Sequence, residues 1–543
     1  MTLMKSILLG SAAGVVAVAS AQAADLPTRK AAPVEYVRVC NVGGITGWTM
    51  PGSDTCVKIS GYMTAHYIGG NLGNQYNSAS SNTALVPIAT ALGDTTAGHL
   101  SQVLMVQGSN VAAPIFNGLT GKSLGVTLPA QGNGTFNRDS QGWNIRANLG
   151  FDFASNTAYG PLIGHMDFNS DLGSGLDSPR GSFTYVNTGY VTWAGITAGK
   201  AQSFYSFIGG GDNWNNFFSP DQKGFNEPIL FAYTASFGGG FTATLAAQSQ
   251  GTNGTSGGGT NMSGSYSAGG NNLGTGIFAP GVTGPTQFGG QRWPDIVGAL
   301  HVKQGWGEAQ VSGVIHNVNV VDSTYYGAAP GVTDCGTLVA VACNAGESKI
   351  GWGIDAGVKV NLPSFGAGDD AILTGSFTRN AAWYSGLPDA QNGENGQVNG
   401  NGQPMYMADA YFNPLTNSWA TPTAWSVSTL IEHHWTPTFY TDFEGSIGGI
   451  NWTGQNGSVL TPTGPMGTGL ISPHAFTYLI GADIGWNPVT NLNFDLELMY
   501  QHVQQDAPSG NIGTVFSTGA FIPGAWQGDS SGFQGRLRIT RYF

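Results

Sequence analysis

Residues that could carry out chemistry are sparse in this sequence. Only 9% of its 543 residues are charged, and it has nine histidines. His433 and His434 are neighbours in a segment with strand-like alternation, so they would point to opposite faces and could not share a metal ion. Glu432 would share a face with His434, and further along Asp442 would share one with Glu444. Isolated acid pairs on a strand are more typical of a water-lined wall than of a catalytic centre.

Other features also argue against an enzyme or a nucleic-acid-binding protein. The chain has no H-E-x-x-H pair and no P-loop. Its formal charge of −12 comes without a basic tract, so nothing would attract a phosphate backbone. We therefore expect no catalytic residues, no metal, no cofactor and no nucleic-acid partner.

The four cysteines form two close pairs. Cys40 and Cys56 flank a segment that contains Gly43-Gly44 and Pro51-Gly52, and Cys335 and Cys343 flank Gly336–Ala342. In an exported protein, such spacing favours two local disulfides. Neither pair is a CxxC and no histidine stands beside them at ligand spacing, so a metal site is the weaker interpretation.

Export itself is indicated by the first 23 residues. Lys5 supplies a positive charge, Ile7–Ala19 is a short apolar stretch, and Ala21-Gln22-Ala23 matches an A-x-A cleavage site. The apolar stretch is too short to cross a bilayer as a helix, which argues against the alternative of a retained anchor. We expect a signal peptide over residues 1–23.

The elements that would position the charged residues are strands. In Leu492–Tyr500, apolar side chains alternate with Asn493, Asp495 and Glu497, which a helix would mix and a strand separates. The same two-residue period runs through Trp143–Phe153 and Ile350–Val360. Few charges, 85 glycines and 11% aromatics suit a β protein with one face in lipid and the other in water. Sixteen segments fit this pattern: 56–68, 141–154, 160–170, 181–193, 196–205, 228–237, 240–250, 293–302, 306–318, 348–361, 370–383, 423–435, 438–450, 474–487, 491–503 and 531–543.

The connections between these segments alternate between short and long. Ala194-Gly195 and Gly238-Gly239 are short, whereas Gly69–Ser140, Gly251–Arg292 and Tyr384–Pro422 are long and rich in small polar residues. Outer-membrane barrels have this asymmetry, with short periplasmic turns and long external loops. The sequence therefore predicts an all-β fold, a sixteen-stranded antiparallel transmembrane β-barrel.

The last predicted strand ends at the chain terminus. Phe533, Leu537, Ile539 and Phe543 share one face. An amphipathic final strand with a terminal aromatic residue resembles the assembly signal of outer-membrane barrels, which assigns that role to Phe543. The final strand of a soluble sandwich is the alternative interpretation.

Three stretches resemble one family. Pro33–Cys40 with Pro51–Tyr62, the stretch Tyr190–Phe204, and the final strand are similar to the alphaproteobacterial porins of the rhizobial and Brucella type. The resemblance implies a homotrimeric barrel in the outer membrane of a Gram-negative bacterium that passes small hydrophilic solutes and ions. It divides the chain into a periplasmic segment with a disulfide hairpin at 24–55 and a barrel at 56–543. It also implies that the loop at 206–227 folds into the lumen.

An infolded loop would place its charges opposite the barrel wall. A constriction lined by opposed charges orients dipolar solutes and sets ion preference. Alternation and barrel closure bring basic residues from the first, second and last strands together. The acidic candidates on the loop are Asp212, Asp221 and Glu227, and the basic candidates on the wall are Lys58, Arg146, Arg536 and Arg538.

Three alternatives to a general diffusion channel stay open. A substrate-specific outer-membrane channel would have the same sequence features. An outer-membrane barrel enzyme needs acidic and histidine residues clustered on the outer loops, and the nine histidines are scattered. A secreted β-rich adhesin would leave the membrane fraction on washing with salt or carbonate.

Overall fold

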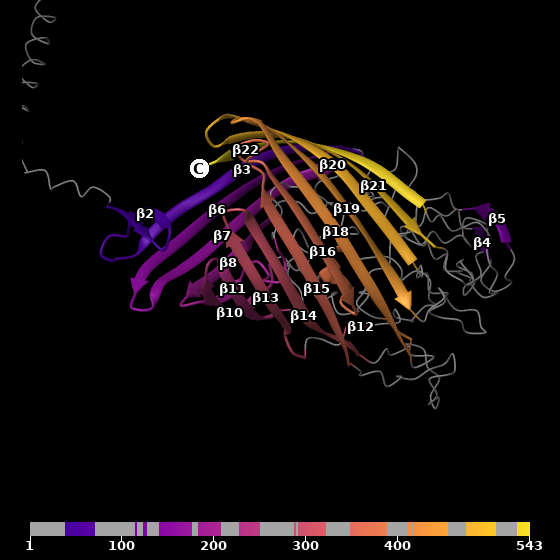
Figure 1. The fold of residues 1–543 in the computed structure, drawn as a ribbon. Helices are drawn as coiled ribbons and strands as arrows, with labels where there is room; N and C mark the ends of the chain where they lie inside the picture. Colours follow the sequence, from indigo (N-terminus) through magenta and orange to yellow (C-terminus); the bar gives the residue numbers. More distant parts are fainter. Residues whose placement is uncertain are drawn as a thin grey trace, which may run out of the picture.

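The computed structural model describes residues 38–70, 114–116, 123–127, 141–175, 183–207, 227–249, 287–288, 292–321, 348–387, 411–413, 418–453, 474–506 and 529–543. Within these ranges almost all of the chain is strand (Figure 1). No helix in them is long and apolar enough to cross a membrane. The signal-peptide prediction, Asp212, Asp221 and the Cys335–Cys343 pair lie outside the described residues.

Sixteen antiparallel strands form the barrel, as the alternation predicted. Each predicted segment corresponds to one of them. They are β3 (Cys56–Gly70), β6 (Gln141–Thr157), β7 (Gly160–Gly175), β8 (Phe183–Trp193), β9 (Ile196–Lys200), β10 (Ile229–Gly238), β11 (Phe241–Gln248), β13 (Asp295–Gln304), β14 (Gly307–Val321), β15 (Ser348–Asn361), β16 (Asp370–Arg379), β18 (Ser418–Thr436), β19 (Phe439–Thr453), β20 (His474–Val489), β21 (Leu492–Gln505) and β22 (Asp529–Tyr542).

The barrel closes where the last strand pairs with the first. In this pairing Arg538 lies opposite His66 and Leu537 opposite Tyr67. The carboxyl end is fixed as well, because the backbone N–H of Phe543 donates to the carbonyl of Gly61 at 3.0 Å. Closure leaves no sheet edge among the sixteen strands, which is what a lipid environment requires of a β structure.

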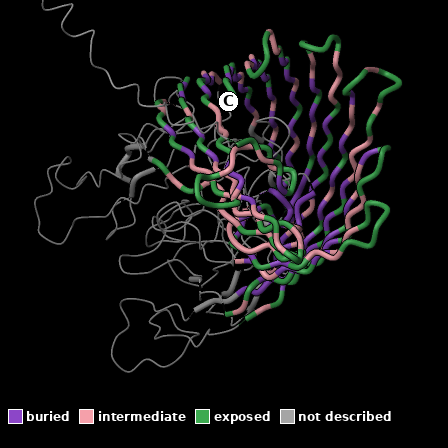
Figure 2. The backbone as a smooth tube through the Cα atoms, turned by 90° about the vertical axis from the view of Figure 1, so that its left-hand side faces the viewer, coloured by how far each residue is buried: buried purple, intermediate pink, exposed green. Residues whose placement is uncertain are grey.

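Burial alternates along the strands, as Figure 2 shows in its change of colour from residue to residue. Outward side chains are apolar and exposed, for example Leu300 at 64% and Val311 at 60%. Tryptophans also stand on this face, among them Trp143, Trp352 and Trp486. Inward side chains are mostly polar, so the barrel has an apolar outer surface and a polar lumen.

Four predicted strand ends differ from the observed ones by four or more residues. β7 continues to Gly175 and not 170, because it stays paired with β6 as far as Gly142. β9 ends at Lys200 and not at 205, because the chain then turns inward and Tyr205 reaches Ser376. β16 ends at Arg379 and not at 383, because Asn380 takes a φ of +52° and a 3-10 helix, η2 (Ala382–Ser385), follows. β18 begins at Ser418, five residues early, because its first residues pair with the short strand β17 (Tyr411–Asn413).

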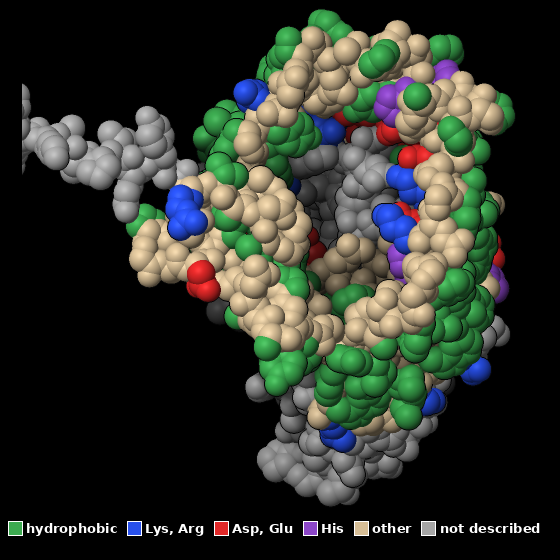
Figure 3. All heavy atoms as spheres, turned by 60° about the vertical axis from the view of Figure 1, so that its left-hand side comes forward, with side chains coloured by type: hydrophobic (Ala, Val, Ile, Leu, Met, Phe, Trp, Pro, Cys, Tyr) green, Lys and Arg blue, Asp and Glu red, His purple; other side chains and the backbone are tan. Residues whose placement is uncertain are grey.

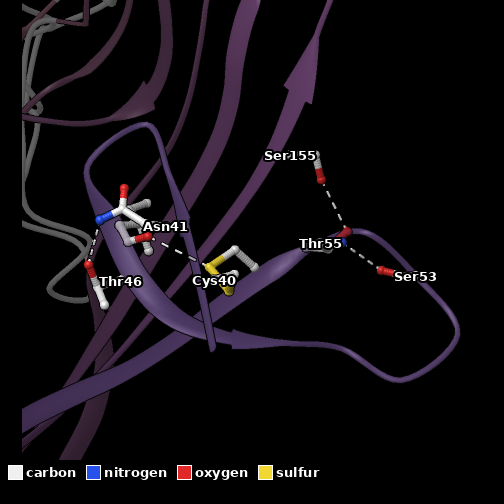
Figure 4. Close-up of a disulfide and its surroundings, with 8 residues drawn as sticks. Cys40, Asn41, Thr46, Ser53, Thr55 and Ser155 are labelled. Carbon is white, nitrogen blue, oxygen red and sulfur yellow. Dashed lines mark hydrogen bonds between the residues drawn. A yellow bond between two sulfur atoms is a disulfide. The ribbon is translucent and has the colours of Figure 1, made fainter. Parts of the chain in front are cut away.

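A hairpin precedes the barrel. β1 (Val39–Val42) and β2 (Ile45–Thr49) are joined by Gly43 and Gly44, both with positive φ, and β2 pairs briefly with β3. Cys40 and Cys56 form a disulfide that joins β1 to the start of β3 (Figure 4). This disulfide confirms the first of the two predicted cysteine pairs. The remaining short strands are β4 (Pro114–Phe116), β5 (Ser123–Thr127) and β12 (Gln287–Phe288).

Candidate functional site

The lumen of the barrel is the candidate site. Figure 3 looks into one open end, where Lys, Arg, Asp and Glu side chains gather on the wall of the opening. The charges stand on the inward positions that two-residue alternation assigns to each strand. We describe the lumen by two opposite environments, a charged wall made by the inner faces of β19–β22 and a packed wall made by the inner faces of β10, β11 and β13–β16.

The four predicted basic residues lie on three adjacent strands, but carboxylates accompany three of them. The Nε of Arg146 is 2.6 Å from Oδ1 of Asp171 on the neighbouring strand β7. The guanidinium of Arg538 is 3.0 Å from Asp495, and that of Arg536 is 4.0 Å from Glu497. Lys58 is exposed near the start of β3, where it lies opposite Asp152. The wall therefore carries mixed charge.

Five carboxylates on the charged wall were not predicted as a group. Asp442, Asp483 and Glu497 lie opposite one another across β19, β20 and β21, and the register continues to Arg536 on β22. Glu444 and Asp495 flank this row, and all five side chains are buried. We call these five residues the carboxylate stripe. Alternation shows the inward direction of each residue, but only the register between strands shows that they meet.

Two glycines shape the stripe. The inner face of β20 reads Gly481, Asp483 and Gly485, so Asp483 has no side chain beside it on its own strand. A Cβ at Gly481 would lie 2.2 Å from Oε1 of Glu444, and one at Gly485 would lie 1.9 Å from the ring of Tyr440. The glycines therefore let side chains from β19 lean across β20 on both sides of Asp483.

The packed wall is covered from inside by the segment Ala201–Phe207. After a turn at Ser203, the hydroxyl of Tyr205 lies 2.8 Å from Oγ of Ser376. The carbonyl of Tyr205 accepts a hydrogen bond from Ser312 at 2.6 Å. The ring of Phe207 lies over Gly357, where a Cβ would be 2.3 Å from it. These contacts cross more than 100 residues of sequence and fix the segment inside the barrel.

A buried polar network completes the packed wall. Ser203 donates to Gln248, Gln248 donates to the hydroxyl of Tyr384 in η2, and Tyr384 donates to Asp295 at 2.6 Å. The Nδ1 of His316 lies 2.8 Å from the same carboxylate, and both of these side chains are fully buried. Burial and the charge of Asp295 raise the pKa of Tyr384 well above its ordinary value. The phenol is therefore a fixed neutral donor.

Glu227 is the predicted loop acid that the structure describes. Its Oε2 lies 3.2 Å from Nζ of Lys200 at the end of β9. Burial raises the pKa of Glu227, although the ammonium group of Lys200 acts in the opposite direction. Asp167 and Arg146 also influence this carboxyl, so it belongs to the lumen side of β6–β9.

One triad-like arrangement occurs on the lumen wall. His165 lies between Asp152, at 2.6 Å from Nδ1, and the hydroxyl of Thr188, at 3.0 Å from Nε2. The hydroxyl of Thr188 donates to Asp167, which also accepts from the Thr188 backbone N–H. A hydroxyl that serves as a donor to a carboxylate is not activated by the histidine. The arrangement is a structural network.

The chain contains three serine motifs of the G-x-S-x-G type, at Gly121–Gly125, Gly254–Gly258 and Gly528–Gly532. The motif at Gly254–Gly258 lies outside the described residues. Ser123 is the first residue of strand β5, and Ser530 is part of β22, where it pairs with Val503. The nucleophile elbow of hydrolases is a sharp strand-to-helix turn, and an extended strand residue does not have that geometry.

The neighbouring histidines of β18 meet at one carboxylate. Nδ1 of His433 lies 2.6 Å from Oδ2 of Asp369, and the backbone N–H of His434 donates to Oδ1 at 2.8 Å. These contacts hold the pKa of Asp369 below its ordinary value. No group of three metal-ligating side chains occurs among the described residues.

Comparison with known proteins identifies the family. A family model described as "Porin subfamily" matches residues 25–89 and 121–521. The chain is 48% identical over 69 residues to the porin Omp2a of Brucella ovis, which is 12% of this chain and 20% of that protein. It is 26% identical over 332 residues to the porin Omp2b of Brucella abortus, which is 59% of this chain and 67% of that protein.

Solved structures of outer-membrane channels are also similar. The channel DcaP of Acinetobacter baumannii matches with a TM-score of 0.47 and 11% identity, over 92% of this chain and 99% of that one. An anion-selective porin from Comamonas acidovorans matches with a TM-score of 0.38 and 9% identity, over 90% of this chain and 100% of that one. The family match covers most of the sequence, and this chain belongs to the porin subfamily.

Proposed function

We propose that this porin forms a passive, water-filled channel for small hydrophilic solutes and ions across the outer membrane of a Gram-negative bacterium. One observation carries the proposal. A closed sixteen-stranded barrel is apolar on the outside and lined by charged side chains on the inside. Charged residues inside a lipid-embedded barrel are tolerated where they line a water-filled path.

The proposed channel carries out no catalysis. The hydroxyl of Thr188 in the triad-like arrangement is committed to Asp167. On β18, the ring of His433 is hydrogen-bonded to Asp369, and the backbone N–H of His434 donates to the same carboxylate. Electrostatic filtering of permeating solutes is therefore the chemistry that these side chains support best.

The loop at 206–227 is proposed to narrow the lumen. Its two ends support this idea, since Ser206 and Phe207 pack against the inner face of the barrel and Glu227 returns to Lys200. A loop tied at both ends to inward-facing residues starts and finishes within the lumen. The proposed filter consists of Asp212, Asp221 and Glu227 on the loop and of Lys58, Arg146, Arg536 and Arg538 on the wall.

The partners of the channel are proposed from the family. The exposed apolar outer face would contact outer-membrane lipid. A homotrimer is the proposed assembly, and chemical cross-linking of the folded protein in detergent should give a ladder that ends at three copies. A ladder that ends at one copy would contradict the trimer but not the channel.

Conductance tests the proposed function. Purified protein added to a planar lipid bilayer should give stepwise current increases whose size rises with salt concentration. Swelling of liposomes that contain the protein should be faster with small sugars than with large ones. Absence of current steps would contradict the channel, and swelling with one sugar but not with others of equal size would indicate a substrate-specific channel.

A further inference from the structure

The carboxylate stripe has more acidic than basic side chains among the described residues of its own wall. Arg538 is matched by Asp495 at 3.0 Å, and Arg536 lies 4.0 Å from Glu497. These two guanidinium groups are the basic side chains on the inner faces of β19–β22 within the described residues, and the stripe has five carboxylates. Neither Glu444 nor Asp483 has a salt bridge in the described part of the chain, and the carboxyls of Glu497 and Asp495 are the groups within hydrogen-bonding reach of them.

The inner faces of the adjoining strands β6–β9 are closer to balance. Arg146 forms a paired contact with Asp171, with Nε at 2.6 Å and a second nitrogen at 3.2 Å. Lys200 lies 3.2 Å from Glu227. The excess of negative charge therefore lies on the charged wall and not evenly around the lumen.

Neutral polar groups beside the stripe give an independent observation. The Oγ of Ser446, the Oε1 of Gln501 and the Nε2 of Gln534 have no hydrogen-bond partner among the described residues, although each residue is more than nine-tenths buried. They occupy inward positions on β19, β21 and β22, next to the stripe in the strand register. Buried polar atoms need partners, and inside a channel the available partners are water and permeating solutes.

Strand geometry concentrates this charge at one level of the lumen. The row Asp442–Asp483–Glu497 crosses three strands, with neighbouring strands about 4.8 Å apart. Gly481 and Gly485 remove the side chains that would separate Asp483 from the residues of β19. A permeating ion that passes the charged wall therefore meets several carboxylates at once.

We infer that the carboxylate stripe makes this channel selective for cations, with Asp483 and Glu444 as its specificity-determining residues. The inference rests on the proposed channel function. Carboxylates along a water-filled path lower the energy of a passing cation and raise that of an anion. The two arginines reduce this effect at the β22 side, so the most favourable cation path lies over β19–β21.

The reversal potential across a salt gradient tests the inference. Wild-type protein is placed in a planar bilayer between concentrated and dilute KCl. The reversal potential should have the sign expected when K⁺ crosses the channel more readily than Cl⁻. The double variant Asp483→Asn with Glu444→Gln should lower the ratio of K⁺ to Cl⁻ permeability by about threefold. Asp54→Asn makes the same change at an exposed residue of the turn before β3 and should leave the ratio unchanged.

The outcomes separate the inference from the function on which it rests. No current from wild-type protein would contradict the channel itself. Current with Cl⁻ preference, or an unchanged ratio in the double variant, would overturn the inference and leave the channel intact. If the double variant fails to fold, each single substitution is measured alone, and an unchanged ratio in both would overturn the inference equally.

Discussion

The packed wall and the charged wall have the same alternation of inward and outward side chains, but their buried carboxylates have different surroundings. On the packed wall, Asp295 is fully buried and contacts both His316 and Tyr384. On the charged wall, Asp483 is equally buried, but the group within hydrogen-bonding reach of it is another carboxyl, that of Asp495. The chain therefore supplies hydrogen-bond donors to the inward carboxylate of the packed wall, whereas it surrounds the inward carboxylate of the charged wall with other acidic side chains.

Inward-facing glycines of the two walls also make room for different kinds of side chain. At Gly357 the missing side chain makes room for the ring of Phe207, which is part of the segment that covers the packed wall. At Gly481 the missing side chain makes room for the end of Glu444. The room at Gly357 lets the covering segment pack against the wall, and the room at Gly481 lets Glu444 lie close to the other carboxylates of the stripe.

The largest expected effect contrasts the two buried aspartates. Asp295→Ala should destabilise the barrel by about 3 kcal/mol, because it leaves Tyr384 and His316 without their shared acceptor. Asp483→Ala should change stability by less than about 1 kcal/mol, because it removes one of several like charges. Urea-induced unfolding in lipid vesicles measures both. Equal losses of stability in the two variants would contradict the proposed difference between the surroundings of Asp295 and Asp483.

Substitution of Gly357 and Gly481 by alanine should have the next largest effect on stability. Gly357→Ala should cost about 1–3 kcal/mol, because its Cβ would meet an aromatic ring 2.3 Å away. Gly481→Ala should cost less, because its Cβ meets the end of a flexible glutamate. The same unfolding assay compares the two variants. A larger loss for Gly481→Ala would indicate that the stripe is rigidly packed.

Selectivity should respond to the arginines of the charged wall. Arg536→Gln removes the cation nearest Glu497 and should raise the ratio of K⁺ to Cl⁻ permeability by about twofold. Lys303→Gln serves as the control, since Lys303 is mostly exposed and pairs with Glu308 at the end of β13. A fall in the ratio for Arg536→Gln would contradict the assigned role of the stripe.

The smallest effect concerns pH and the turn between β15 and β16. Hydrogen bonds from His434 and His433 lower the pKa of Asp369 in the folded state, so its contribution to stability exists above the ordinary carboxyl pKa and disappears as the pH falls. Asp369→Ala should therefore lower the thermal midpoint at neutral pH and have a smaller effect near about pH 3. An effect that grows as the pH falls would contradict this origin.

Much of the barrel could be predicted from two-residue alternation, because one face of every strand meets lipid. Alternation predicted strands that were too long where the chain leaves the sheet to cover the packed wall, after Lys200 and after Arg379. It placed Asp442 and Glu444 on one face but could not align them with Asp483, because register depends on turns and long loops. The contact between Tyr205 and Ser376 joins residues 171 positions apart, and no local pattern indicates it.

The most direct test of the two-wall account is the accessibility of cysteines placed on each wall. In a background with Cys335→Ser and Cys343→Ser, the substitutions Asp483→Cys and Ser376→Cys put one thiol on the charged wall and one on the packed wall. A water-soluble cationic thiol reagent should reduce the single-channel current of the Asp483→Cys channel and leave the Ser376→Cys channel unchanged. Equal reaction at both positions, or reaction only at Ser376→Cys, would contradict the account.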